Sequence, residues 1–209
     1  MKKILIIVLV LLSVAARADE SSQRALAAMS AAIKALGTYE MRFTVSAGSE
    51  MAPMEGVVVV SGDRYSIALP TGELFGDEKT ACRIDPESKT ATLMPVDPKD
   101  RSILSNPARA FDLLDGTFTH RDAGPAKIFG RNTTEIELIP VDRTLPLKKL
   151  MLYIDSGTSL PVAARYGIEG LNATVSVEIK SMKSLPQVDA SKFIFDKKRY
   201  KGYEIIDLR

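Results

Sequence analysis

The chain has 209 residues, of which 45% are hydrophobic, and its 28 basic and 26 acidic residues give a formal charge of +2. This near balance excludes the strongly basic surface that binding to nucleic acids or other polyanions requires. Cys82 is the only cysteine, so the chain cannot form an internal disulfide.

Residues 1–18 have the pattern of a secretory signal peptide. They begin with two lysines after the initial methionine, continue with an apolar run over residues 4–14, and end in Ala16-Arg17-Ala18, which places small residues before a cleavage site. The alternative, an uncleaved membrane anchor, needs about 20 apolar residues, and this run is shorter. We therefore expect cleavage after Ala18 and export across the membrane, and the mature chain would have no cysteine at its new amino terminus to carry a lipid.

Removal of these residues would take away three basic and no acidic residues, which leaves 25 against 26 and a net charge of −1. The remaining 191 residues, 19–209, are enough for one domain with a substantial core, with two smaller domains as the alternative. No low-complexity linker divides them, so we expect a single domain.

Residues 21–36 predict an amphipathic helix. Leu26, Met29 and Ile33 recur at spacings of three and four, so they would share one face of the helix. A serine at either of the first two positions can cap the amino end, and Gly37 is placed to end the helix.

The pattern then changes to a period of two. From Tyr39 to Val45 apolar and polar side chains alternate, as they do in a strand with one buried face and one wet face. Residues 57–60 and 64–69 flank a Ser-Gly-Asp turn and predict a hairpin. In the second strand of this hairpin we expect Tyr65, Ile67 and Leu69 on the inner face, and Arg64, Ser66 and Ala68 toward solvent.

Further alternating segments predict a large sheet. The segments are residues 80–84, 90–96, 135–138, 150–154, 160–168 and 172–180. Eight to eleven strands in hairpin order indicate an antiparallel sheet, which must curl, split or close at that size. One helical interruption is expected, because Asn106-Pro107 is a helix-start signal and Ala108–Leu114 places Phe111 and Leu114 on one stripe.

No residue pattern in the sequence indicates an enzyme. His120 is the only histidine, which argues against a histidine-rich metal site. His120-Arg121-Asp122 matches a kinase tripeptide without the other kinase motifs, so we interpret it as a solvated turn. No serine lies in a Gly-x-Ser-x-Gly turn, which makes a secreted hydrolase the weaker alternative. We expect neither a cofactor nor a bound metal.

Several segments, taken in order, resemble the periplasmic outer-membrane lipoprotein carrier family, LolA-like. They are the first strand Tyr39–Thr44, the segment Gly76–Thr80 followed by Ile84-Asp85-Pro86, and above all Val188–Phe195. The ending Gly202–Arg209 is similar to the Bacteroidetes form of the family. The sequence departs from the family pattern at Ala81-Cys82-Arg83, at Val45 and in having no tryptophan, and the family's lid-locking arginine has no clear counterpart.

This resemblance implies an unclosed antiparallel β-barrel of about eleven strands, mainly β with some α, in which amphipathic helices cover the concave apolar face. It implies a monomeric carrier that takes acylated lipoproteins from an inner-membrane lipoprotein-releasing transporter and passes them to an outer-membrane acceptor. The alternative is a periplasmic lipid-binding or sensor protein of the same fold.

A cavity between helices and sheet would receive the acyl chains, with methionines as deformable lining. Its expected lining residues are Met41, Phe43, Val57, Val59, Tyr65, Ile67, Leu69, Met94, Phe111, Leu114, Leu138, Met151 and Tyr153. Two of them, Phe111 and Leu114, belong to the second helix and are expected to act as a lid.

Overall fold

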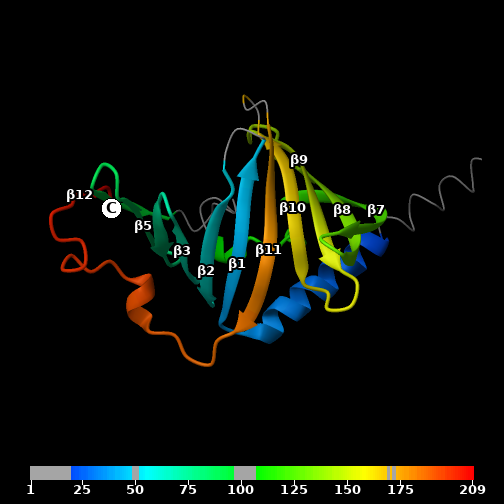
Figure 1. Ribbon diagram of the computed structural model, residues 1–209, viewed down its shortest axis with the longest axis horizontal. Helices are drawn as coiled ribbons and strands as arrows, with labels where there is room; N and C mark the ends of the chain where they lie inside the picture. The colour runs from blue at the N-terminus through cyan, green and yellow to red at the C-terminus, as the bar shows by residue number, and fades with distance from the viewer. Residues whose placement is uncertain (1–19, 49–51, 97–106, 169, 171–172) are drawn as a thin grey trace, which may run out of the picture. The chain divides into compact units, whose positions relative to one another are not determined.

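The computed structural model describes residues 20–48, 52–96, 107–168, 170 and 173–209. The expected signal peptide and Asn106 lie outside these residues. The described residues form one α-helix and twelve strands, and the strands join in one sheet in the order β12-β6-β5-β4-β3-β2-β1-β11-β10-β9-β8-β7 (Figure 1). The two ends of this order, β12 and β7, do not pair with each other, so the sheet is not closed into a barrel.

The chain divides into two compact units, which are described in turn. Unit 1 comprises the chain up to Ile33 and Leu113–Ser176, and unit 2 comprises Lys34–Asp112 and Val177–Arg209. Among the described residues, no helix combines the length and the apolar composition that crossing a membrane requires.

The helix runs through residues 20–36, as the spacing of its apolar residues predicts. Leu26, Met29 and Ile33 are all buried. The helix ends because Gly37 adopts a φ of 64°, a left-handed conformation that glycine reaches at little cost, and its N–H donates to the carbonyl of Lys34 at 3.1 Å.

Unit 1 contains the helix up to Ile33 and an antiparallel set of strands. The strands are β7 (Phe118–Ile128), β8 (Arg131–Pro140), β9 (Leu147–Asp155), β10 (Pro161–Ile168) and the first residues of β11 (Thr174–Ser184). One face carries the buried Ile136, Leu138 and Leu152, because Ile136 pairs with Leu152. The opposite face carries a separate small core of Ile128, Tyr153, Val162 and Ala163.

Unit 2 is built on a meander of six strands. They are β1 (Tyr39–Ala47), β2 (Met54–Ser61), β3 (Arg64–Leu69), β4 (Gly72–Gly76), β5 (Thr80–Asp85) and β6 (Thr90–Pro95). The predicted hairpin of β2 and β3 is present, with Ser61 opposite Arg64 and Gly62 at a φ of 61° in the turn. The unit also holds the 3₁₀ turns η1 (Pro107–Arg109) and η2 (Ala190–Phe193), the rest of β11, and β12 (Glu204–Asp207).

A second core lies on one face of β4–β6 and is covered by the chain's last residues. Phe75, Cys82, Ile84, Ala91 and Leu93 pack there against Tyr200, with Phe195, Tyr203 and Ile205 around it. The rings of Phe195 and Tyr200 stack with centroids 5.5 Å apart. Cys82 is therefore a buried apolar residue, as expected of a lone thiol in a strand.

Polar contacts hold this covering segment in place. Glu73 accepts a hydrogen bond from the Arg199 guanidinium at 2.8 Å and one from the Tyr200 hydroxyl at 3.2 Å. The guanidinium of Arg64 lies over the ring of Phe193, 5.2 Å from its centroid. The segment then ends as β12, which pairs parallel to β6, so the sheet departs from the expected purely antiparallel order.

The predicted second helix over residues 108–114 is wrong. After the 3₁₀ turn at Pro107–Arg109 the chain continues as turns, since so short a helix has little stability of its own. The Asp115 carboxylate accepts hydrogen bonds from the N–H and the hydroxyl of Thr117, and Gly116 adopts a φ of 87°. These local bonds compete with a helical path for the backbone.

Candidate functional site

The strongest candidate for a binding surface is an apolar stretch on one face of β1–β4. Directly paired residues of neighbouring strands lie on the same face. Met41 pairs with Val58, Val58 with Ile67, and Ile67 with Leu74. We call the half-buried members of this face the β1–β4 patch, and they are Met41, Phe43, Ile67, Leu69 and Leu74.

Gly56 is the reason that the aromatic ring of Phe43 can lie across the patch. The two residues are paired, and a Cβ added to Gly56 would clash with the Phe43 ring and lie 2.8 Å from Leu69 Cδ2. The absence of a side chain at Gly56 therefore lets the ring cover the β2 backbone, a way of compensating for glycine within a sheet.

The next row of the same face is fully buried. It consists of Tyr39, Val60 and Tyr65, which are paired across β1, β2 and β3. The turn η1 contacts β3, and the charge of Asp112 acts on Tyr39, so residues 107–112 lie close to this row. Burial and that charge raise the pKa of Tyr39 to about 12, and burial with the charge of Asp77 does the same for Tyr65.

The structure separates the thirteen expected lining residues. On the patch face of unit 2 lie Met41, Phe43, Tyr65, Ile67, Leu69 and Met94. Val57 and Val59 lie on the opposite face, because they pair with Arg42 and Glu40. Successive residues of a strand point to opposite sides, so these two valines cannot line the same surface as Ile67.

Unit 1 divides its share of the expected residues in the same way. Leu138 lies on the face of Ile136, whereas Met151 and Tyr153 lie on the other face, where Arg165 stacks over the Tyr153 ring. Of the expected lid residues, Phe111 is half-buried in unit 2, and Leu114 is 42% exposed in unit 1. The expectation that all thirteen residues line one cavity is therefore wrong. That the residues on the patch face bind a ligand stays a prediction.

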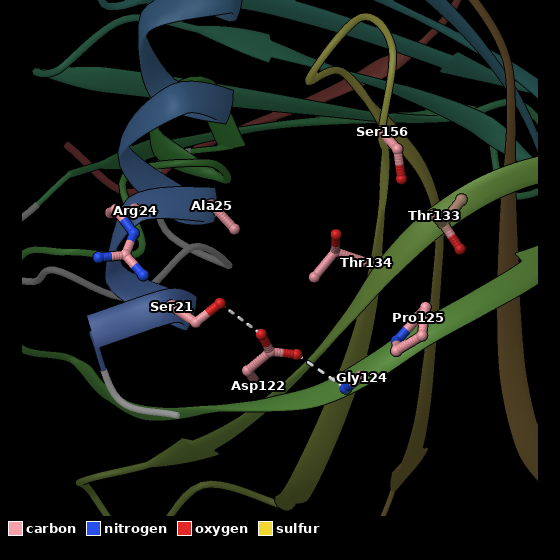
Figure 2. A pocket seen from close by; sticks show the side chains of 9 residues that line it. All are labelled: Ser21, Arg24, Ala25, Asp122, Gly124, Pro125, Thr133, Thr134 and Ser156. Carbon is pink, nitrogen blue, oxygen red and sulfur yellow. Dashed lines mark hydrogen bonds between the residues drawn. The ribbon is translucent and has the colours of Figure 1, made fainter. Parts of the chain in front are cut away.

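Unit 1 contains a pocket of about 440 Å³ beside the amino end of the helix. Figure 2 shows the side chains that line it, which are Ser21, Arg24, Ala25, Asp122, Gly124, Pro125, Thr133, Thr134 and Ser156. Several of its polar groups bond within the unit: Arg24 pairs with Glu20 at 2.7 Å, and Thr133 donates to the carbonyl of Ala126.

The tripeptide His120-Arg121-Asp122 lies in this region and is not the solvated turn that we expected. It belongs to β7. Asp122 accepts a hydrogen bond from the Ser21 hydroxyl at 2.6 Å and one from the N–H of Gly124 (Figure 2), and His120 Nδ1 lies 2.8 Å from Ser22 Oγ. Arg121 points to the opposite face, where it pairs with Glu137 at 2.8 Å. The tripeptide thus joins the helix to the sheet.

Sequence reasoning missed this joint because its two halves are about a hundred positions apart. The alternation of His120 and Asp122 around Arg121 is the local signal that could have indicated a strand. Among the described residues, no three histidine, cysteine, aspartate or glutamate side chains gather as metal ligands would.

Comparison with known proteins identifies the fold. No protein-family model matches the sequence, and no curated protein matches it. Solved structures do. An uncharacterised conserved protein from Thermus thermophilus has a TM-score of 0.61 at 8% identity, and the match covers 88% of this chain and 98% of that chain.

Two further structures are informative. A domain from Vibrio parahaemolyticus, described as an outer-membrane lipoprotein-sorting protein, has a TM-score of 0.51 at 9% identity, with 88% of this chain and 99% of that chain covered. The MucA/MucB complex of Pseudomonas aeruginosa has a TM-score of 0.50 at 14% identity, with 84% and 62% covered. At these identities the likeness shows a shared fold. The open β-barrel fold that the resemblance implied, mainly β and not closed, is therefore confirmed.

Proposed function

We propose that this protein is a periplasmic carrier that shields the acyl chains of lipoproteins between the inner and outer membranes. The observation that carries the proposal is the β1–β4 patch, an apolar surface that unit 2 leaves only half-buried. Single hydrophobic residues scattered on a surface are common and carry no meaning, but Phe43, Ile67 and Leu69 are half-buried and lie together on one face.

The free energy gained by burying an acyl chain is compatible with a protein that binds the chain and later releases it. Each acyl CH₂ removed from water is worth about 0.8 kcal/mol, so a sixteen-carbon chain represents roughly 12 kcal/mol before the costs of association. A partly covered apolar surface can hold such a chain and still release it, because the cover returns when the chain leaves. Residues 107–112, which contain Phe111, lie close to the patch face and are the cover that this proposal assigns to unit 2.

The fold supports the proposal through the lipoprotein-sorting domain that shares it. Under the proposal, residues 1–18 direct export, and protein recovered from the periplasm begins at Asp19. The loading transporter and the outer-membrane acceptor are partners only by resemblance.

Neighbouring residues of β3 provide a matched test. Leu69 belongs to the patch, and the adjacent Ala68 is exposed and pairs with Val57 on the other face. Protein exported to and purified from the periplasm is titrated with a fluorescent fatty-acid ester. Leu69→Asp should weaken binding about tenfold or more, because a charge would have to be buried beneath the chain. Ala68→Asp should leave it unchanged. Equal losses, or no binding by the wild type, would refute the carrier function.

The second candidate is a sensor that binds a lipid and regulates a protein partner. It is favoured by one specific observation, the likeness of the fold to MucB in the MucA/MucB complex. A carrier should deliver a bound lipoprotein to an acceptor membrane, whereas a sensor should bind its lipid without delivery. A transfer assay between vesicles and outer-membrane fractions distinguishes the two.

A further inference from the structure

The Tyr65 hydroxyl is buried, and the described residues offer it no hydrogen-bond partner. Its side chain is 0% exposed. The great majority of buried polar side-chain atoms in proteins are paired, and an unpaired one lowers stability. The pairing of Tyr200 with Glu73 shows how unit 2 satisfies another tyrosine. The lack of a partner for the Tyr65 hydroxyl therefore needs an explanation.

The position of Tyr65 connects it to the β1–β4 patch. It lies two residues before Ile67 on the same strand and therefore on the same face. Across β4 its paired residue is Gly76, which has no side chain. Gly76 cannot be replaced easily, since an added Cβ would clash with the backbone carbonyl of Thr80. The patch thus continues from apolar side chains to a phenol whose paired residue on β4 has no side chain.

The negative charge of Asp77 determines which kind of ligand group the Tyr65 hydroxyl would bind. Asp77 follows Gly76, and its carboxylate is fixed by the N–H groups of Lys79 and Thr80 at 2.8 and 2.9 Å. Burial and the charge of Asp77 raise the pKa of Tyr65 to about 12, so its hydroxyl keeps its proton and can donate at neutral pH. The same negative charge disfavours an anionic partner such as the carboxylate of a free fatty acid.

We infer that the Tyr65 hydroxyl donates a hydrogen bond to the carbonyl oxygen of a neutral acyl ester or amide whose hydrocarbon chain lies on the β1–β4 patch. This inference rests on the proposed function, because it needs an acyl chain on the patch. It adds a preference: esters and amides, as in acylated lipoproteins or phospholipids, bind better than free fatty acids of the same length.

Tyr65→Phe tests the inference, because it removes the hydroxyl and keeps the ring. Three probes are titrated into the full chain: a fluorescent fatty-acid methyl ester, the same labelled fatty acid, and the hydrocarbon diphenylhexatriene. The wild type should bind the ester more tightly than the acid. Tyr65→Phe should weaken ester binding about three- to tenfold, the value of one neutral hydrogen bond, and leave hydrocarbon binding unchanged. Unchanged ester binding, or equal losses for ester and hydrocarbon, would overturn the inference.

Stability without a ligand gives an independent readout. Tyr65→Phe should be as stable as the wild type or more stable, since it removes an unpaired buried donor. Tyr200→Phe is the matched control: it loses the bond to Glu73 on the other face, so it should unfold at lower urea concentration and keep the wild-type ratio of ester to hydrocarbon affinity. If Tyr65→Phe loses as much stability as Tyr200→Phe, the hydroxyl has a partner in the free protein and the inference is wrong.

The probes also separate two failures. If the wild type binds neither ester nor hydrocarbon, the carrier function fails and this inference fails with it. If both bind and Tyr65→Phe changes neither, only the role of Tyr65 fails. Competition by a diacylglyceryl-cysteine lipopeptide would identify lipoproteins as the source of the carbonyl, and competition by phosphatidylethanolamine alone would identify phospholipids. Competition by neither would contradict the inference.

Discussion

Phe43 and Gly56 lie directly opposite each other on β1 and β2, and the aromatic ring of Phe43 occupies the space that a side chain on Gly56 would need. The pair shows that the β1–β4 patch depends on a residue without a side chain. It also shows why an apolar residue at position 56, where the alternation of β2 would otherwise allow one, would change the patch.

Gly56→Ala should therefore displace the Phe43 ring. We expect it to cost about 1–3 kcal/mol, as overpacking usually does, because the new methyl group also meets Leu69. Equilibrium unfolding in urea measures the change. Gly167→Ala on β10 is the control, since an added Cβ there meets nothing within 4 Å, and it should cost little. Equal costs for both variants would mean that the ring moves aside freely.

The joint between helix and sheet can be tested at Asp122. Asp122→Ala removes the acceptor for both Ser21 and Gly124, and we expect a loss of about 1–2 kcal/mol in the free energy of unfolding. The neighbouring Arg121→Ala removes an exposed ion pair with Glu137 and should cost less than about 1 kcal/mol. Thermal unfolding followed by circular dichroism compares them. A greater loss from Arg121→Ala would show that the joint does not hold the helix.

The buried tyrosines predict a loss of stability at alkaline pH. Tyr39 and Tyr65 have pKa values raised from 10.0 to about 12, so the folded state holds these protons more tightly than the unfolded state. Their contribution is complete below about pH 10 and is lost as the pH rises from about 10 through 12. Urea unfolding at about pH 9 and pH 11 should show this decrease. The double variant Tyr39→Phe, Tyr65→Phe should show a smaller one, and an unchanged decrease would assign it to other groups.

Local patterns were enough to predict the secondary structure over much of the chain. The helix of residues 20–36 follows from the spacing of Leu26, Met29 and Ile33, and the hairpin at Gly62 from its turn residues. Local patterns failed where strands were short or polar: β7 was missed because its charged residues resemble a solvated turn, and β12 because its four residues pair only with β6.

The sequence by itself determined the first helix and the alternation of most strands, because both periodicities follow from the backbone geometry of residues near one another in the chain. The open-barrel fold was implied by the resemblance of several segments to a known family. Only the tertiary structure decided which side chains of neighbouring strands lie on the same face of the sheet. Val57 and Ile67 are both apolar and both on predicted strands, yet register places them on opposite faces. The patch, the isolated Tyr65 hydroxyl and the Ser21–Asp122 joint likewise depend on pairings between distant segments, and no local pattern encodes such pairings.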